Sequence, residues 1–271
     1  MSRAAALVAT AAVAASLALW QALALIRWPR ARRRTNHRGA AIPVVLGGAL
    51  VVGAGASGLA AAGLDEAFVP ASVWVPWIAL FVVGWLDDRS HGGPRGLAGH
   101  VRSLLRGSPT TGILKLVVGI AAALWVAVDA GGTPVRVTAA TIVVAVGTNV
   151  WNALDVQPGR ALKWGLVALV ALLAATWAAG LGLFVAAAVG ASLALLPLDL
   201  RERAMLGDEG SNPLGFLVGA GLALTLPTPA LVTAAALLLV LQVAAETVTI
   251  SRLIEGVPPL RWVDRLGRKT T

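Results

Sequence analysis

Long apolar segments follow one another along almost the whole chain, and they constrain its fold more than any other feature. A helix needs about 20 mainly apolar residues to cross the roughly 30 Å hydrocarbon core of a membrane. Apolar residues make up 58% of the 271 residues and charged residues only 13%, which exceeds what a soluble core of this size buries. The sequence therefore predicts an all-α, polytopic transmembrane helix bundle of about nine helices.

These helices are expected to form a single integral membrane domain over residues 1–271. The expected spans are residues 4–27, 40–63, 68–86, 110–129, 136–155, 160–179, 181–199, 211–227 and 229–252. Little more than Ala179 and Gly180 separates the sixth span from the seventh, so a count of eight or ten helices remains open.

Basic residues concentrate in alternate loops of this predicted bundle. Lys and Arg are enriched in the cytoplasmic loops of membrane proteins. With the N-terminus outside and the C-terminus in the cytoplasm, only Arg3 and Arg136 fall on the outer side. The cytoplasmic loops then lie near residues 27–39, 87–109, 155–163 and 199–211, with a tail at 252–271. Because these segments hold nearly all the polar side chains, we expect any active site to face the cytoplasm.

The net charge of +9 has two open interpretations. Basic inner loops orient a bundle of this kind and also lie well against anionic lipid head groups. Alternatively, the arginine cluster between Arg27 and Arg38 binds a phosphate group. A nucleic-acid partner is not expected, because no basic domain stands clear of the apolar segments.

Carboxylates occur at three places on the predicted inner side: Asp87 with Asp88, Asp155, and Asp208 with Glu209. A carboxylate at the membrane boundary is costly unless it is paired, hydrated or bound to a cation. One or two carboxylates together with substrate phosphates are the usual ligands of Mg²⁺. Adjacent residues of a helix point in different directions, so one of Asp87 and Asp88 would face a metal while the other contacts substrate. A solvated helix end with a local ion pair is the alternative.

The segment MLGDEGSNPLG, residues 205–215, combines glycines, carboxylates and a serine in front of an apolar run. Ordinary turn chemistry explains part of it, with Ser211 or Asn212 as the N-cap and Pro213 as the first helical residue. A loop bordered by Gly207 that leads into a helix N-terminus is also suited to bind an anion.

Two asparagines and an aspartate follow one another at helical spacing near the end of the fifth predicted span. Asn149, Asn152 and Asp155 are three residues apart, so we expect them along one helical face. Asparagine amides both donate and accept hydrogen bonds, which suits contact with a nucleotide base or a sugar. Hydrogen bonding between helices is the structural alternative for this pair.

In their order along the chain, these motifs resemble those of the polyprenyl-phosphate N-acetylhexosamine-1-phosphate transferases. This superfamily includes phospho-N-acetylmuramoyl-pentapeptide transferase and the UDP-N-acetylglucosamine enzymes that start O-antigen and teichoic acid synthesis. TNHRGAAIPVVLGG resembles the first inner motif, GWLDDR the Gly-x-x-Asp-Asp motif, and NVWNALD the Asn-x-x-Asn-x-x-Asp helix end. MLGDEGSNPLG resembles the Met-Gly-Asp-x-Gly-Ser-x-x-Leu-Gly signature, and Lys115 stands where the family usually has a lysine. The likeness runs from about Thr35 to Asp264.

The resemblance implies that the phosphate of a membrane polyprenol attacks the β-phosphorus of a UDP-amino sugar with the help of Mg²⁺, or of Mn²⁺ in its place. The products would be a polyprenyl-diphosphate sugar and UMP. It implies catalytic roles for Asp87, Asp88 and Asp208, with Asp208 as the main metal ligand and Asp87 as a second. It implies substrate binding by Lys115, Asn149, Asn152, Asp155, Gly207 and Ser211.

The resemblance also implies a biological setting. The expected partners are polyprenyl phosphate and a UDP-sugar, and the expected location is a bacterial inner membrane, with a role in cell-wall biogenesis such as peptidoglycan synthesis. A homodimer, or contact with envelope-assembly proteins, is a further open possibility.

The chain also departs from the family pattern. Where the family usually continues Asp-Gly-x-Asp-Gly, residues 155–159 read DVQPG, and the tail from residue 251 lacks the histidines of the family's last inner loop. Two functions therefore stay open: a divergent transferase, or a non-catalytic membrane scaffold that binds polyprenyl phosphate or an envelope-assembly partner. Retention of Asp87, Asp88 and Asp208 favours the enzyme, because drift without catalysis would remove costly boundary carboxylates early.

Overall fold

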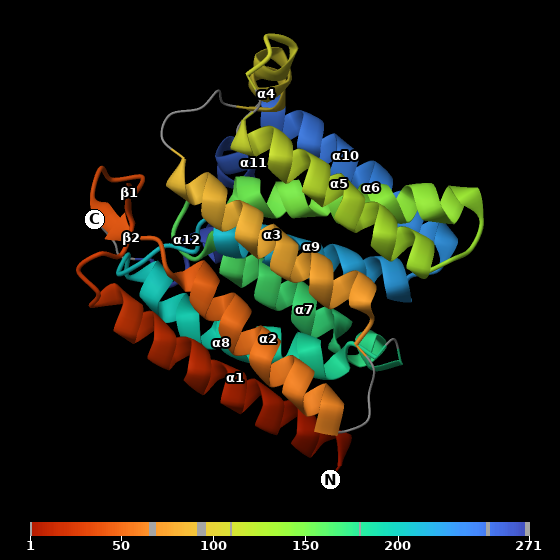
Figure 1. Ribbon diagram of the computed structural model, residues 1–271, viewed down its shortest axis with the longest axis horizontal. Coiled ribbons are helices and arrows are strands. Elements are labelled where there is room, and N and C mark those ends of the chain that lie inside the picture. Colours follow the sequence, from red (N-terminus) through yellow and green to blue (C-terminus); the bar gives the residue numbers. More distant parts are fainter. Residues whose placement is uncertain are drawn as a thin grey trace.

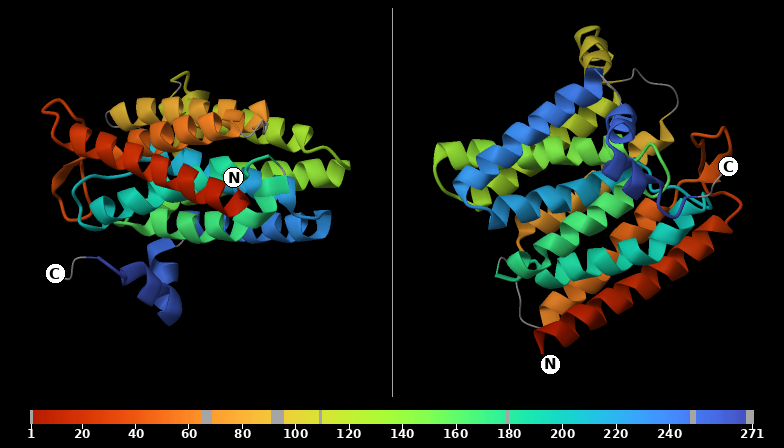
Figure 2. Two further views of the ribbon diagram at one scale, coloured as in Figure 1. Left: turned by 90° about the horizontal axis from the view of Figure 1, so that it is seen from below. Right: turned by 180° about the vertical axis from the view of Figure 1, so that it is seen from behind.

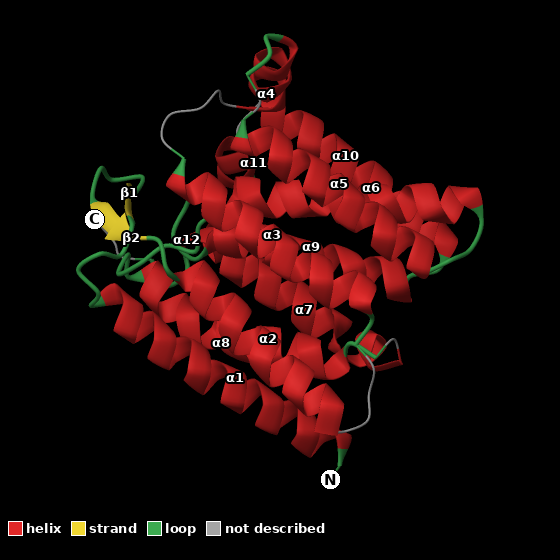
Figure 3. Ribbon diagram, viewed as in Figure 1, coloured by secondary structure: helices red, strands yellow, loops and turns green. Residues whose placement is uncertain are grey.

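The apolar segments form long helices in the computed structural model, which describes residues 2–64, 69–90, 96–108, 110–178, 180–247 and 250–268. The helices are α1 (Arg3–Ile26), α2 (Leu46–Leu64), α3 (Ala71–Arg89), α4 (Gly96–Leu105), α5 (Thr111–Asp129), α6 (Pro134–Leu154), α7 (Arg160–Ala178), α8 (Gly182–Leu200), α9 (Asp208–Thr225), α10 (Thr228–Thr247), α11 (Ile250–Gly256) and α12 (Pro258–Arg265). Two short strands, β1 (Arg33–Thr35) and β2 (Ala41–Pro43), form the sheet seen in Figure 3.

Seven of the described helices are long and apolar enough to cross a membrane, namely α1, α2, α3, α5, α6, α7 and α8. The other two predicted spans correspond to α9, whose first turn carries two carboxylates, and to α10, whose apolar part is the shorter stretch Thr228–Ala244. The prediction of an all-α polytopic bundle is therefore confirmed.

Helix α9 runs through the centre of the bundle. It packs against α2, α3, α5, α6 and α7, and almost every residue from Glu209 to Ala223 is buried. On one side of α9, α1 and α2 pack with α8, and on the other side α6 packs between α5 and α10 (Figure 1). The beginning of α9 is thereby surrounded by the ends of its neighbours.

Two glycines let the main chains of α2 and α3 come into contact with the main chain in the first turn of α9. A Cβ at Gly84 of α3 would collide with the main chain of Asp208, and a Cβ at Gly47 of α2 would collide with that of Gly210. Close-packed interiors have no spare volume for such a group. The positions of Asp208 and Glu209 are therefore set by main-chain packing.

The second helix begins later than predicted. The expected span started at residue 40, whereas α2 starts at Leu46 because the preceding residues form an antiparallel hairpin in which Arg34 pairs with Ile42. The Oδ1 atom of Asn36 accepts the N–H groups of Arg38 and Ala40, at 3.0 and 2.8 Å, and shapes the turn. After the hairpin, the chain forms a parallel bridge to the segment just before α9.

The last predicted span is also divided. It was expected to continue to residue 252, but α10 ends at Thr247 and a separate short helix, α11, begins at Ile250. Pro258 then lies in the first turn of α12, where a missing N–H is tolerated. In Figure 2 these two C-terminal helices project from one face of the bundle.

One end of the bundle carries most of the arginines and lysines, and we call it the basic end. It holds the C-terminal ends of α1, α3, α6 and α8, the N-terminal ends of α2, α5, α7 and α9, and the hairpin (Figure 1). At the opposite end Arg136 donates to the carbonyl of Leu226, which follows α9, at 2.7 Å and to that of Ala223 in its last turn at 2.9 Å, so this arginine caps the helix.

Candidate active site

Three charged side chains from three helices meet at the basic end. The Nζ atom of Lys115 on α5 lies 3.0 Å from Oδ2 of Asp87 on α3 and 2.5 Å from Oδ2 of Asp208 on α9. Thr111, one turn before the lysine, donates to the other oxygen of Asp87. The three charged side chains are 18 to 20% exposed, so they are open to solvent at the bundle surface.

Asp88 points away from this group, as expected for adjacent residues of a helix. Its Oδ2 atom accepts the N–H of Glu209 at 3.0 Å, and its Oδ1 atom accepts a hydrogen bond from Arg34 of the hairpin at 2.6 Å. Only 2% of its side chain is exposed. Asp88 therefore acts as an N-cap for α9 that is supplied by another helix. We call Asp87, Asp88, Lys115 and Asp208 the carboxylate site.

The start of α9 differs from the prediction. Ser211 or Asn212 was expected to cap a helix beginning at Pro213, whereas the helix begins at Asp208, with Gly207 before it at φ 70°. Because Asp88 takes an orphan N–H of the first turn, no local serine or asparagine cap is needed. Asn212 instead donates to the carbonyl of Asp208 at 2.8 Å.

Asp155 lies near the main chain of Gly207, where an anion site was expected. Burial, reinforced by the charges of Asp199, Asp208 and Asp88, raises the pKa of the Asp155 carboxyl well above its ordinary value. Asp155 directly follows the last residue of α6 and lies close to the loop that leads to Asp208.

The two asparagines of α6 contact different partners. Asn152 accepts a hydrogen bond from Ser211 on α9 at 3.0 Å, close to the carboxylate site. Asn149 donates to Gln242 of α10 at 2.8 Å. The expected face therefore brings Asn152 and Asp155 to the start of α9, whereas Asn149 contacts α10.

Two contacts of the site had weak signals in the sequence. Glu209 is 5% exposed and accepts the N–H of Gly48 at 3.1 Å, so it ties α9 to α2. Arg34 stands in a run of three arginines, and nothing local distinguishes it from Arg33. Thr111 was not singled out either, although it lies one helical turn before Lys115.

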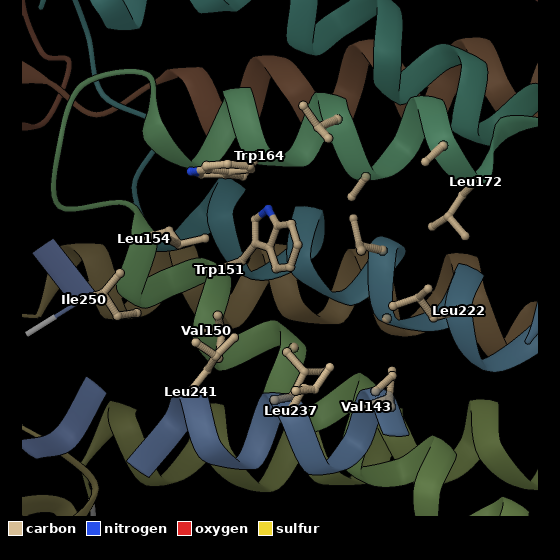
Figure 4. Close-up of a pocket in the computed structure, with 18 of the residues that line it drawn as sticks. Val143, Val150, Trp151, Leu154, Trp164, Leu172, Leu222, Leu237, Leu241 and Ile250 are labelled. Carbon is tan, nitrogen blue, oxygen red and sulfur yellow. The ribbon is translucent and has the colours of Figure 1, made fainter. Parts of the chain in front are cut away.

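An apolar cavity of about 590 Å³ lies between α6, α7, α9 and α10, and residues of α11 and α12 also line it. Figure 4 shows Trp151 and Trp164 on one side of it and Leu237 and Leu241 on the other. The indole nitrogen of Trp151 is buried and has no hydrogen-bond partner among the described residues. Trp151 directly precedes Asn152, so part of the cavity lining lies at the end of α6 that contacts Ser211 of α9.

The C-terminal tail, expected as an active-site segment, docks on the start of α7. Arg160 forms two hydrogen bonds with Asp264, at 2.8 and 3.0 Å, and a third with Ser251 at 2.9 Å. Arg268 reaches Asp264 at 2.6 Å, and Lys163 donates to three main-chain carbonyls of the tail at 2.5 to 3.2 Å. We call Arg160, Lys163, Asp264 and Arg268 the tail clamp.

The tail clamp shifts the titration of its carboxylate. Burial opposes ionisation of Asp264, but hydrogen bonds from Arg160 and the positive charges of Arg160 and Arg268 outweigh it and hold the pKa of Asp264 below its ordinary value. Arg160 and Asp264 are only 1 and 4% exposed. The tail is therefore fixed by a buried ion pair in which each nitrogen of the Arg160 guanidinium has a hydrogen-bond partner.

The fold and the charged site define a multi-pass membrane protein with its polar chemistry gathered at one end of a helix bundle. The family model described as Glycosyl transferase family 4 matches residues 70–226, more than half of the chain. The chain therefore belongs to glycosyl transferase family 4, which confirms the resemblance to the polyprenyl-phosphate sugar-phosphate transferases. Comparison with the curated proteins gives no match.

Proposed function

We propose that the protein transfers a sugar 1-phosphate from a UDP-amino sugar to polyprenyl phosphate and releases UMP. One observation carries the proposal: the carboxylates of Asp87 and Asp208, on two different helices, both lie within hydrogen-bond distance of the Lys115 ammonium on a third helix. All the residues expected at the site, from Asp87 to Ser211, also lie inside the segment that matches the transferase family.

The reaction asks the protein mainly for positioning and charge neutralisation. An oxygen of the lipid phosphate forms a bond to the β-phosphorus, while the bond from that phosphorus to the bridging oxygen breaks and UMP leaves with the electron pair. A phosphate monoester is largely ionised at neutral pH, since its second pKa is about 6, so the nucleophile needs no strong base. Catalysis of phosphoryl transfer comes mostly from alignment and electrostatic stabilisation. Lys115 is placed to donate to the transferred phosphate.

The donor set at the site fits a magnesium ion. In the described part of the chain, no group of three or more His, Cys, Asp or Glu side chains is arranged to hold a metal. Mg²⁺, however, is commonly bound by one or two carboxylates together with phosphates and water. Asp87 and Asp208 already share one cationic group, the ammonium of Lys115. In the proposal they hold Mg²⁺, which would neutralise the diphosphate.

The polar residues at the start of α9 and the end of α6 suit the nucleotide-sugar. Ser211 and Asn152 form a hydrogen bond with each other and offer donors and acceptors to a sugar hydroxyl or a base. Asp155, one turn further along α6, lies near Gly207 in the loop before Asp208 and in the proposal supports this loop. In the proposal Asn149 contacts the same substrate from the side of α10.

The apolar cavity suits the polyprenyl chain. Its lining is almost entirely aliphatic or aromatic, and Val150, Trp151 and Leu154 line it at the end of α6 that carries Asn152. A long isoprenoid lying there would bring its phosphate toward the basic end of the bundle. We further propose that this end faces the cytoplasm of a bacterial cell, where nucleotide-sugars are made, and that the product enters cell-envelope glycan synthesis.

The proposal is tested by measuring UMP release from purified protein with Mg²⁺, polyprenyl phosphate and a panel of UDP-sugars. We expect release that requires every component and is lost in Asp208→Asn. Asp129→Asn is the matched control, because Asp129 accepts a hydrogen bond from Ser72 at the opposite end of the bundle. No release from folded protein, with a related enzyme active in the same assay, would favour a non-catalytic scaffold that binds the lipid or an envelope-assembly partner.

A further inference from the structure

Arg34 brings a guanidinium to the carboxylate site from the hairpin. Its Nη1 atom donates to Oδ1 of Asp88 at 2.6 Å, and 47% of its side chain remains exposed. The hairpin precedes the segment that matches the transferase family, which begins at residue 70. The family match therefore says nothing about what this arginine does.

The site carries more negative than positive charge. If all groups are ionised, the ion pairs among the described residues join three carboxylates, those of Asp87, Asp88 and Asp208, to two cations, Lys115 and Arg34. The ammonium of Lys115 is already hydrogen-bonded to two of the carboxylates. A substrate phosphate that enters such a site needs a cation with free donors. Arg34 has such donors, because only its Nη1 atom is hydrogen-bonded to Asp88 and 47% of its side chain is exposed.

We propose that Arg34 binds a phosphate group of the substrates while it keeps its contact with Asp88. A guanidinium presents five N–H donors in a planar fork that matches two phosphate oxygens, whereas an ammonium acts as a point charge. The inference rests on the proposed transfer reaction. The phosphate is either the monoester of the lipid or the diphosphate of the nucleotide-sugar, since both present the same oxygens.

The support of Arg34 is rigid enough for this role. The arginine lies in β1 opposite Ile42, and the turn of the hairpin is held by Glu202, which accepts from Asn36 at 2.5 Å and from Arg38 at 3.1 Å. Glu202 has φ 54°, an uncommon conformation for a residue with a side chain. The segment that contains Glu202 leads directly to Asp208, so the hairpin and the site are fixed to one another.

The test compares Arg34→Gln and Arg34→Lys with Arg33→Gln, the neighbouring arginine of the same strand, whose Nη1 lies 3.4 Å from the carbonyl of Ala41. We expect Arg34→Gln to raise the KM of one substrate about tenfold to a hundredfold, the range for a charge-assisted hydrogen bond. Arg34→Lys should restore the contact with Asp88 and normal thermal stability. Its KM, however, should return only part of the way to the normal value. Arg33→Gln should behave as the unchanged protein.

The substrate whose KM rises identifies the phosphate. A rise for polyprenyl phosphate alone assigns Arg34 to the lipid, and a rise for the UDP-sugar alone assigns it to the diphosphate. A fall in kcat and thermal stability with both KM values unchanged, fully restored by Arg34→Lys, would overturn the inference and leave Arg34 as a support for Asp88.

A second measurement separates this inference from the proposed function. Binding of inorganic pyrophosphate to the purified protein is measured by calorimetry, without any transfer reaction. We expect the affinity of Arg34→Gln to fall about tenfold relative to Arg33→Gln. Equal affinities would overturn the inference even if UMP release confirms the transferase. A protein that transfers no sugar but shows the difference would refute the proposed reaction and retain the phosphate contact.

Discussion

Two groups of charged residues lie at the same end of the bundle, and they differ in how their hydrogen bonds are used. In the tail clamp, each donor group of the Arg160 guanidinium has a partner and Lys163 contacts three carbonyls. In the carboxylate site, Lys115 is shared by two carboxylates and Arg34 keeps exposed donors. The central pair of the first group, Arg160 and Asp264, is 1 and 4% exposed, whereas Asp87, Lys115 and Asp208 of the second group are 18 to 20% exposed.

This difference teaches how similar chemistry is used for two purposes. A buried ion pair in which each guanidinium nitrogen has a partner holds two segments together and costs several kcal/mol to break. A cation shared between exposed carboxylates exchanges partners at little cost, since water and other ions can replace it. The tail clamp is therefore a structural contact, and the carboxylate site is suited to take up charged ligands.

The largest effect is expected from Asp264→Ala. The change leaves Arg160 buried without its carboxylate, which destabilises a protein by about 3–5 kcal/mol. The tail should detach from α7 and become sensitive to protease, with a lower midpoint of thermal unfolding in detergent. Glu255→Ala, an exposed position on α11, should stay within about 0.5 kcal/mol of the unchanged protein. A tail that remains protected would mean that the carbonyl contacts of Lys163 suffice.

Lys115→Met tests the carboxylate site, the second of the two groups compared. Loss of the ammonium should reduce transfer by about 10²–10³-fold, the usual effect of removing one electrostatic contact to a transition state. The same change should strengthen binding of Mn²⁺, because the lysine no longer competes for Asp87 and Asp208. Mn²⁺ affinity is measured by electron paramagnetic resonance. Lys163→Met in the tail clamp should leave it unchanged, and equal affinities in all three proteins would contradict a cation site at these carboxylates.

Gly84→Ala should have a smaller effect. It tests whether the packing of α3 against α9 fixes the position of Asp208. The new methyl group meets the main chain of Asp208, and overpacking of this kind costs about 1–3 kcal/mol. We expect lower thermal stability together with weaker transfer, because Asp208 moves. Gly119→Ala on α5 is the control, since no atom lies within 4 Å of the added group and helix propensity improves. Normal transfer by Gly84→Ala would show that the position of Asp208 tolerates adjustment.

The smallest effect is expected from pH. The pKa of Asp264 is lower in the folded protein than the ordinary value of 3.8, so its contribution to stability is complete above that value. The contribution is lost as the pH falls through the folded pKa. Thermal unfolding recorded between pH 6 and pH 3 should therefore show a decline at the acid end that Asp264→Asn lacks. Parallel curves for the two proteins would remove Asp264 from this dependence.

The sequence predicted the helices well because each long apolar segment must satisfy its backbone within itself in a membrane. It also identified the carboxylates, since boundary charges are rare and their motifs follow a known order. It did not predict the start of α9, because the N-cap comes from Asp88 on another helix and not from Ser211 nearby. The partner of Asn149 could not be identified for the same reason, since Gln242 is 93 residues away.

The short elements escaped prediction for a different reason. The hairpin and helices α11 and α12 span few residues and have no long period of apolar positions, so local preferences do not define them. Their geometry depends on contacts with distant segments, such as Glu202 for the hairpin and Arg160 for the tail. The sequence predicted that charges would gather at this end, but not which charges would be paired.

The central position of α9 has a consequence for how the protein is made. The helices that pack most extensively on α9 are α2, α3, α5, α6 and α7, and each of them precedes it in the chain. When α9 leaves the ribosome, the helices that will surround it have already been synthesised. They include Lys115, which pairs with Asp208, and Gly48, whose N–H donates to Glu209. A helix that would insert poorly alone can therefore enter the membrane as the last piece of its own site.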